Sequence, residues 1–99
     1  MLWGAAGVRS KNKRAATVAE REHIERVAAL ECVVCDEPPP SEVHEPEQGM
    51  WWIALPTCPL CHRGPDGWHG TRLRWKLRKV TELSAIDKTI KRLMTQERT

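Results

Sequence analysis

Four cysteines form two pairs, each with two residues between its members, and these side chains are the strongest candidates for chemistry in the chain. The pairs are Cys32 with Cys35 and Cys58 with Cys61. A two-residue spacing lets a tight turn direct both thiolates at one point, and two such turns complete a tetrahedron around zinc. We therefore predict that all four cysteines bind one structural Zn²⁺. A rubredoxin-like iron site and a pair of redox dithiols are the alternatives, although a thioredoxin-type motif would need a βαβ context that is missing here.

Three of the four histidines lie on segments that such a zinc site would bring together. His44 follows the first cysteine pair, His62 comes directly after Cys61, and His69 lies a short distance further on. Imidazole can serve as a metal ligand or as a general base near neutral pH. A single histidine is more often structural, but three histidines around one scaffold favour a functional site. The fourth, His23, lies within a predicted helix and is interpreted as a helix-face residue.

One helix is predicted before the cysteine pairs and one after them. The first begins at Thr17, which forms a capping-box pattern with Glu20, and it ends near Leu30 or Glu31. The second follows Thr81 and carries one apolar stripe among charged positions. That stripe consists of Leu83, Ile86, Ile90, Leu93 and Met94. Residues 71–80 fit the period of a strand and also that of a helix, so the pattern does not decide between them.

Loops and short strands are predicted between the cysteine pairs and just after them. Three consecutive prolines exclude a helix or a central strand, so residues 36–49 are predicted to form a loop with one short strand around 42–45. Residues 50–55 are apolar and β-prone, and they are predicted to form a strand. Residues 58–62 are predicted to form a tight turn, and residues 64–67 a second one.

The composition is that of a small zinc-bound domain with a basic tail. The 99 residues are 40% hydrophobic and 29% charged, and no apolar run approaches the ~20 residues of a membrane span. The first residues lack the pattern of a signal peptide, so we expect a cytoplasmic protein with reduced cysteines. Residues 1–16 are predicted to form a flexible basic arm, and residues 17–99 a single domain. Two basic blocks flank an acidic middle, which is typical of a polyanion-binding protein and also of a solvated face.

The order of these features resembles the zinc-stapled HNH nucleases of the ββα-metal fold. More narrowly, it is similar to the phage recombination-enhancement (Ref-type) nucleases. The matching segments are Glu31-Cys-Val-Val-Cys35, Val43-His-Glu-Pro-Glu-Gln-Gly49, Cys58-Pro-Leu-Cys-His62 and Gly67-Trp-His-Gly70. The resemblance covers about residues 18–95. It implies an α+β fold in which a small zinc-bound ββα-metal core lies between an N-terminal and a C-terminal helix.

The resemblance also implies a metal-dependent DNA endonuclease that hydrolyses phosphodiester bonds. His44 would be the general base, and His62 and His69 would bind a catalytic Mg²⁺ or Mn²⁺, with Glu45 as a further candidate ligand. The DNA backbone would be held by basic residues. These are Arg63, Arg72, Arg74, Lys76, Arg78 and Lys79. Ref-type proteins act on RecA-coated DNA, so a RecA filament in a bacterial host or phage-infected cell is the implied partner, and no membrane is involved.

One departure from the HNH pattern concerns the group that orients the base. The middle Asn of HNH is absent, because residues 52–55 contain no amide side chain. His44 would therefore need a backbone carbonyl in its place. The alternative function is a non-catalytic zinc-stapled module that binds DNA or a protein through its basic blocks.

Overall fold

The structure is a computed structural model that describes residues 15–96, so residues 1–14 of the predicted basic arm lie outside the described residues. The elements in chain order are α2 (Val18–Ala28), β1 (Glu42–His44), the 3-10 helix η1 (Trp51–Ile53), β2 (Leu55–Thr57), α3 (Pro59–His62), α4 (Leu73–Leu77) and α5 (Glu82–Gln96). The predicted α+β fold class is confirmed. Within residues 15–96, no helix has the length and apolar content needed to cross a membrane.

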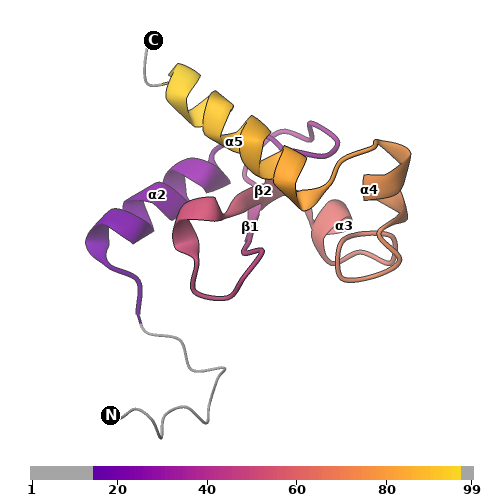
Figure 1. The fold of residues 1–99 in the computed structure, drawn as a ribbon, viewed down its shortest axis with the longest axis horizontal. Coiled ribbons are helices and arrows are strands. Elements are labelled where there is room, and N and C mark those ends of the chain that lie inside the picture. The colour runs from indigo at the N-terminus through magenta and orange to yellow at the C-terminus, as the bar shows by residue number, and fades with distance from the viewer. Residues whose placement is uncertain (1–14, 97–99) are drawn as a thin grey trace, which may run out of the picture.

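A two-stranded antiparallel hairpin lies at the centre of the fold (Figure 1). His44 of β1 pairs with Leu55 of β2, and Glu42 pairs with Thr57. A hairpin of this size is marginally stable alone, so the surrounding helices must stabilise it. Figure 1 shows α2 on one side of the hairpin, α3 and α4 on the other, and α5 running across it. The predicted short strand around residues 42–45 is confirmed as β1.

Helix α2 begins as the sequence predicts. Thr17 Oγ1 accepts a hydrogen bond from the backbone N–H of Glu20, and the Glu20 carboxylate accepts one from the backbone N–H of Thr17. The helix ends at Ala28, slightly earlier than predicted. Its buried His23 places Nε2 3.2 Å from the carbonyl oxygen of Trp52.

The predicted strand over residues 50–55 is wrong for most of its length. Trp51–Ile53 form a turn of 3-10 helix, in which the N–H of Ala54 donates to the carbonyl oxygen of Trp51. Strand β2 begins only at Leu55 and continues through Pro56 to Thr57. The physical reason is tertiary, because η1 packs against α2 and its Trp52 carbonyl is taken up by His23 instead of by a neighbouring strand.

Residues 58–80 form two short helices joined by a turn-rich loop. The predicted tight turn at residues 58–62 is one turn of helix, α3, whose Cys61 N–H donates to the Cys58 sulfur. The ambiguous segment 71–80 contains helix α4, although Leu73 and Leu77 of this helix are exposed. Trp75 fixes how α4 faces the core, since its side chain is 1% exposed and its indole N–H donates to the Cys61 carbonyl oxygen at 2.8 Å.

Helix α5 is confirmed, but it buries only part of the apolar stripe predicted for it, because Ile86 packs against the core and Leu93 is half-buried. Its fully buried positions are Ala85 and Thr89, which face the hairpin and α2. Leu83, Ile90 and Met94 are exposed on the neighbouring face. The core that α5 covers is small and surrounds the cysteines. Its buried members are Cys32, Val33, Val34, Leu55, Cys58, Cys61, Trp75 and Ala85.

Candidate metal centres

The four cysteines converge as the sequence predicts. Their sulfur atoms all lie within 4.8 Å of one another, and the Cys35 and Cys58 sulfurs are 3.6 Å apart. Tetrahedral Zn²⁺ with Zn–S bonds of ~2.3 Å requires sulfur–sulfur distances of ~3.8 Å, so the cluster fits zinc. None of the four forms a disulfide, and three of them are buried. The chain thus contains a candidate four-cysteine zinc site.

Backbone turns direct the cysteine sulfurs inward. In the first turn, the N–H groups of Val34 and Cys35 point at the Cys32 sulfur, at 3.4 and 3.5 Å. Asp36 closes this turn in the left-handed region, at φ 66°. The N–H of Val33 donates to the carbonyl oxygen of Pro56, which connects the first cysteine pair to β2 and hence to the second pair.

The local environment of the cysteines is both buried and positively charged. Burial raises the pKa of the Cys61 thiol, and the Arg74 guanidinium opposes this shift because its Nε lies 3.3 Å from the Cys61 sulfur. Burial also raises the pKa of Cys58. A metal at this site must therefore displace protons from buried thiols, and Arg74 would offset the negative charge of the resulting thiolates.

A second cluster lies immediately beside the first. His44, His62 and His69 each offer a ring nitrogen, and these atoms lie within 4.8 Å of one another. The ring centroids of His62 and His69 are 4.9 Å apart, and those of His44 and His62 are 5.2 Å apart. His44 is 3% exposed, His62 is half-buried and His69 is exposed, so the cluster opens to solvent on the side of His69. Three convergent imidazoles can bind a divalent metal or combine a ligand pair with a base.

Each histidine of this cluster comes from a different element. His44 ends β1, His62 ends α3, and His69 lies in the loop that follows α3. The N–H of His69 donates to the His62 carbonyl oxygen at 3.0 Å, which folds this loop back onto α3. Gly70 permits the fold, because a Cβ there would overlap the carbonyl oxygen of Pro65. Because His62 follows Cys61 directly, the two clusters share one short helix.

Two carboxylates hold ring nitrogens of the cluster. Glu82 Oε2, from the first residue of α5, lies 2.8 Å from His44 Nε2. Glu42 Oε1 lies 3.0 Å from His62 Nδ1, and its carboxylate also forms a bidentate pair with Arg63. The hydrogen bonds from Arg63 and then His62 lower the pKa of Glu42 to about 2. Burial lowers the pKa of His44, an effect that Glu82 partly offsets.

Aromatic side chains form one wall of the histidine cluster. The Trp68 ring centroid is 5.7 Å from that of His44 and 4.8 Å from that of Trp75. The Arg72 guanidinium carbon lies 3.6 Å above the centre of the Trp68 ring, and Arg72 Nε donates to the Trp68 carbonyl oxygen at 2.8 Å. The Trp68 ring therefore lies between the Arg72 guanidinium and the buried His44.

The remaining predicted site residues divide between internal contacts and open surface. Glu45 is not a member of the histidine cluster, and its carboxylate accepts a hydrogen bond from the Gly49 N–H. Of the residues predicted to bind DNA, Arg63 pairs with Glu42 and Arg74 contacts Cys61. Three more lie exposed on α4 or just after it. These are Lys76, Arg78 and Lys79.

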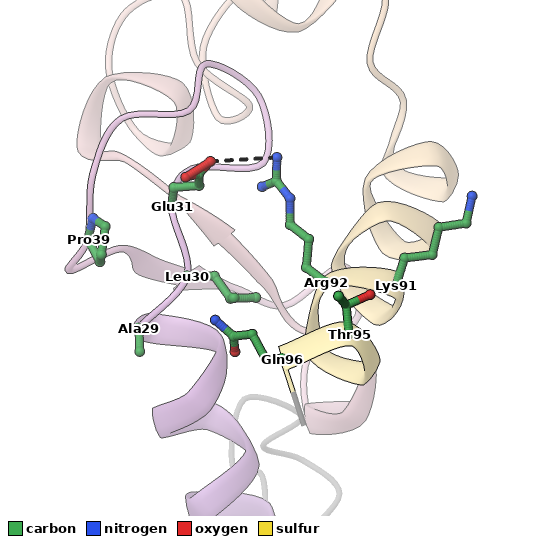
Figure 2. Close-up of a pocket in the computed structure, with 8 residues that line it drawn as sticks. All are labelled: Ala29, Leu30, Glu31, Pro39, Lys91, Arg92, Thr95 and Gln96. Atoms are coloured by element: carbon green, nitrogen blue, oxygen red, sulfur yellow. Dashed lines mark ion pairs between the residues drawn. The ribbon is translucent and has the colours of Figure 1, made fainter. Parts of the chain in front are cut away.

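Two hollows of the described surface lie away from both clusters. One, of about 460 Å³, lies between the end of α2, the proline loop and the second half of α5 (Figure 2). Figure 2 shows Arg92 extending across it toward Glu31, and Arg92 also pairs with Asp36 at 3.2 Å. The other, of about 490 Å³, is lined by η1 and neighbouring residues. No cysteine or histidine of the two clusters lines either hollow.

Comparisons with known proteins do not assign this site to a family. No protein family, curated protein or solved structure matches the chain. The functional argument therefore depends on the geometry of the two clusters and on the motifs that resemble HNH nucleases.

Sequence reasoning missed Glu82 as part of the candidate site. Glu82 lies 38 residues from His44 in the chain and belongs to a helix that was predicted on its apolar stripe alone. A carboxylate directly after the helix-capping Thr81 was the available signal. It could not be connected with His44 until the packing of α5 against the hairpin was known.

Proposed function

We propose that the protein is a metal-dependent DNA endonuclease that hydrolyses phosphodiester bonds, with His44 as its general base. One observation carries the proposal: His44, His62 and His69 converge from three elements, and carboxylates hold ring nitrogens of two of them. Carboxylate–histidine pairs that converge on one point are typical of metal and acid–base sites. A hairpin followed by a short helix also agrees with the ββα-metal order.

His44 has the surroundings that a general base needs. Burial lowers its pKa, which favours the neutral imidazole near pH 7. Its Nε2 faces the Glu82 carboxylate, so the ring proton belongs on Nε2 and leaves the lone pair on Nδ1. During hydrolysis, Nδ1 accepts a proton from water as the water oxygen bonds to phosphorus. The bond between phosphorus and the leaving sugar oxygen breaks in the same displacement.

His62 and His69 are the proposed ligands of the divalent cation. They lie at the solvent-exposed side of the cluster, where a phosphodiester can approach. Two imidazoles favour a first-row transition metal such as Mn²⁺ over Mg²⁺. When bound, the cation would polarise the phosphate and stabilise the charge that develops on the leaving oxygen.

Exposed cations near the cluster are the proposed contacts for the DNA backbone. Lys76 on α4 is exposed, as are Arg78 and Lys79 just after it, and Arg72 lies on Trp68 beside the histidines. Phosphate contacts of this kind position a duplex without reading its sequence. On the resemblance alone, we propose that the DNA is presented as a RecA filament.

The test is a cleavage assay on supercoiled plasmid and single-stranded DNA. It uses Mg²⁺, Mn²⁺ or no added metal, with and without a RecA filament. Wild type, His44→Ala and His23→Ala are compared, and the zinc content of each is measured. His23 is the matched control, because it is also a buried histidine but contacts η1 rather than the cluster. We expect His44→Ala to lose at least ~100-fold in rate, since general-base catalysis contributes about 10²–10⁴-fold.

Retained cleavage in His23→Ala, together with loss in a zinc-loaded His44→Ala, would support the nuclease. The absence of cleavage by a folded, zinc-loaded wild type on every substrate would refute it. In that case the exposed cations would favour the second candidate, a non-catalytic zinc module that binds DNA. DNA affinity unchanged by His44→Ala would then be the expected result.

A further inference from the structure

The buried His44 contacts a carboxylate that lies 38 residues further along the chain. Its Nε2 is 2.8 Å from Glu82 Oε2, and the side chains are 4% and 27% exposed. No amide is available on residues 52–55, where HNH sequences carry the orienting Asn, and the sequence predicts a backbone carbonyl as the substitute. The partner in the structure is instead a side chain of α5.

The first turn of α5 holds Glu82 in place. The Ser84 N–H donates to Thr81 Oγ1 at 3.0 Å, and the Thr81 N–H donates to Ser84 Oγ at 2.9 Å. These two bonds fix the start of the helix, and the buried Ala85 anchors the same turn in the core. A carboxylate in the first turn is also stabilised as the anion by the helix dipole.

An anionic acceptor at this position determines what the ring of His44 can do. A carboxylate accepts only, so it requires the proton on Nε2 and leaves Nδ1 without one. Its short bond also fixes the rotation of a ring that already packs against His62, His69 and Trp68. Charge-assisted hydrogen bonds are stronger than bonds to a neutral carbonyl.

We propose that Glu82 is the positioning residue for His44. It would orient the His44 ring in place of the Asn of HNH sequences, and it does so from α5. The inference rests on the proposed function, because it assigns Glu82 a part in the same hydrolysis. Glu82 does not touch the substrate in this proposal. It acts through the orientation and protonation pattern of His44.

The first test needs no turnover. We would record the imidazole ¹⁵N and ring N–H signals of the full-length, zinc-loaded chain labelled at histidine, for wild type, Glu82→Ala, Glu82→Gln and Asp87→Asn. In wild type we expect the proton of His44 on Nε2, with a downfield, slowly exchanging signal. Glu82→Ala should lose that signal, and Glu82→Gln should keep a weaker one through its amide oxygen. Asp87 is the control, because it lies on the same helix but is exposed, and its carboxylate pairs with the exposed Lys91 at 3.4 Å.

The second test measures steady-state cleavage with the same variants. We expect Glu82→Ala to lower kcat by about 10–100-fold with little change in KM, as for other partners of functional histidines, and Glu82→Gln to recover part of the loss. Asp87→Asn should behave as wild type. A His44 proton on Nδ1 in wild type would overturn the proposal, and so would a ring N–H signal or a kcat that Glu82→Ala leaves unchanged.

The two tests separate the two proposals. If the folded wild type does not cleave DNA, the nuclease function fails, and the ring N–H signal alone still decides whether Glu82 fixes His44. If wild type cleaves DNA but Glu82→Ala changes neither readout, the nuclease stands and the role of Glu82 fails.

Discussion

A guanidinium–thiol contact connects helix α4 to the cysteine cluster. Arg74 Nε is 3.3 Å from the Cys61 sulfur, and the same contact raises the pKa of Arg74, which stays protonated. A four-thiolate metal site carries net negative charge in a buried setting, and a cationic donor stabilises such charge. The contact therefore places Arg74 beside the candidate zinc site, where its charge would stabilise bound thiolates.

Arg74→Gln should weaken metal retention at the cysteine cluster. Loss of a charged neighbour of a ligand typically costs about 10–100-fold in metal affinity. We expect zinc to leave the variant correspondingly faster when a chromogenic chelator is added, followed by absorbance. Arg74→Lys should be intermediate, because it keeps the charge but loses the planar guanidinium.

Lys76→Gln is the matched control for this change. It removes the same charge from the same helix, but Lys76 is exposed, whereas Arg74 contacts the Cys61 sulfur. We expect zinc release at the wild-type rate in Lys76→Gln and weaker DNA binding. Equal release rates in Arg74→Gln and wild type would contradict the assignment of Arg74.

At the scale of elements, the loop between α3 and α4 determines where His69 lies. The loop returns to α3 through hydrogen bonds from the N–H groups of Trp68 and His69 to the carbonyl oxygens of Cys61 and His62. Gly70 makes this return possible, because its backbone is too close to Pro65 to accommodate a Cβ. The close approach thus connects the composition of one turn to the geometry of the histidine cluster.

Gly70→Ala should displace His69 while leaving the cysteine cluster intact. Overpacking of this kind costs about 1–3 kcal/mol, and the strain falls on the loop that carries the ligand. We expect Mn²⁺ binding at the histidine cluster, followed by electron paramagnetic resonance, to weaken at unchanged zinc content.

Gly49→Ala provides a control of similar energetic cost. Gly49 has open space around it but a φ of 89°, so alanine there is strained by about 1–2 kcal/mol, in the loop between β1 and η1 and not in the loop that carries His69. This variant should lose stability and keep Mn²⁺ binding. If both variants bind Mn²⁺ as wild type does, the loop is not what positions the ligand.

Features set by local interactions were predictable from the sequence, whereas those set by packing were not. The capping box at Thr17 acts within a few residues and is confirmed in the structure, and the two cysteine pairs, each with local spacing, place their four sulfurs close together as predicted. The turn at Trp51–Ile53 was mistaken for a strand because its hydrogen bonds depend on contact with α2. The Glu82–His44 pair depends on the docking of α5, which no local pattern encodes.

At the scale of the whole molecule, the hydrophobic core and the candidate zinc site are the same region. Three of the four cysteines are among the buried core residues, and Trp75, Leu55 and Ala85 pack around them. The sheet contributes only two strands of three residues each, which cannot hold a domain of this size together. We therefore expect zinc binding at the cysteine cluster to contribute a large share of the folding free energy.

Removal of zinc should consequently unfold the domain rather than loosen one loop. Structural zinc contributes apparent free energies of about 10–16 kcal/mol in finger peptides, which equals or exceeds the ~5–15 kcal/mol stability of a typical domain. We expect a strong chelator to abolish the near-UV circular dichroism of the buried Trp75 and the cooperative melting transition. Adding Zn²⁺ should restore both, and adding Mg²⁺ should not, because thiolates select the softer ion.

Acid should have the same effect as chelation, since protons compete with the metal for thiolates. Burial raises the pKa of Cys58 and Cys61, so these thiols take up protons readily as zinc is lost. Because Cys61 and His62 share helix α3, the histidine cluster should disperse in the same transition, and Mn²⁺ binding should disappear together with the circular dichroism signal. A metal-free chain that still melts cooperatively and binds Mn²⁺ would show that the fold and the histidine cluster persist without the cysteine site.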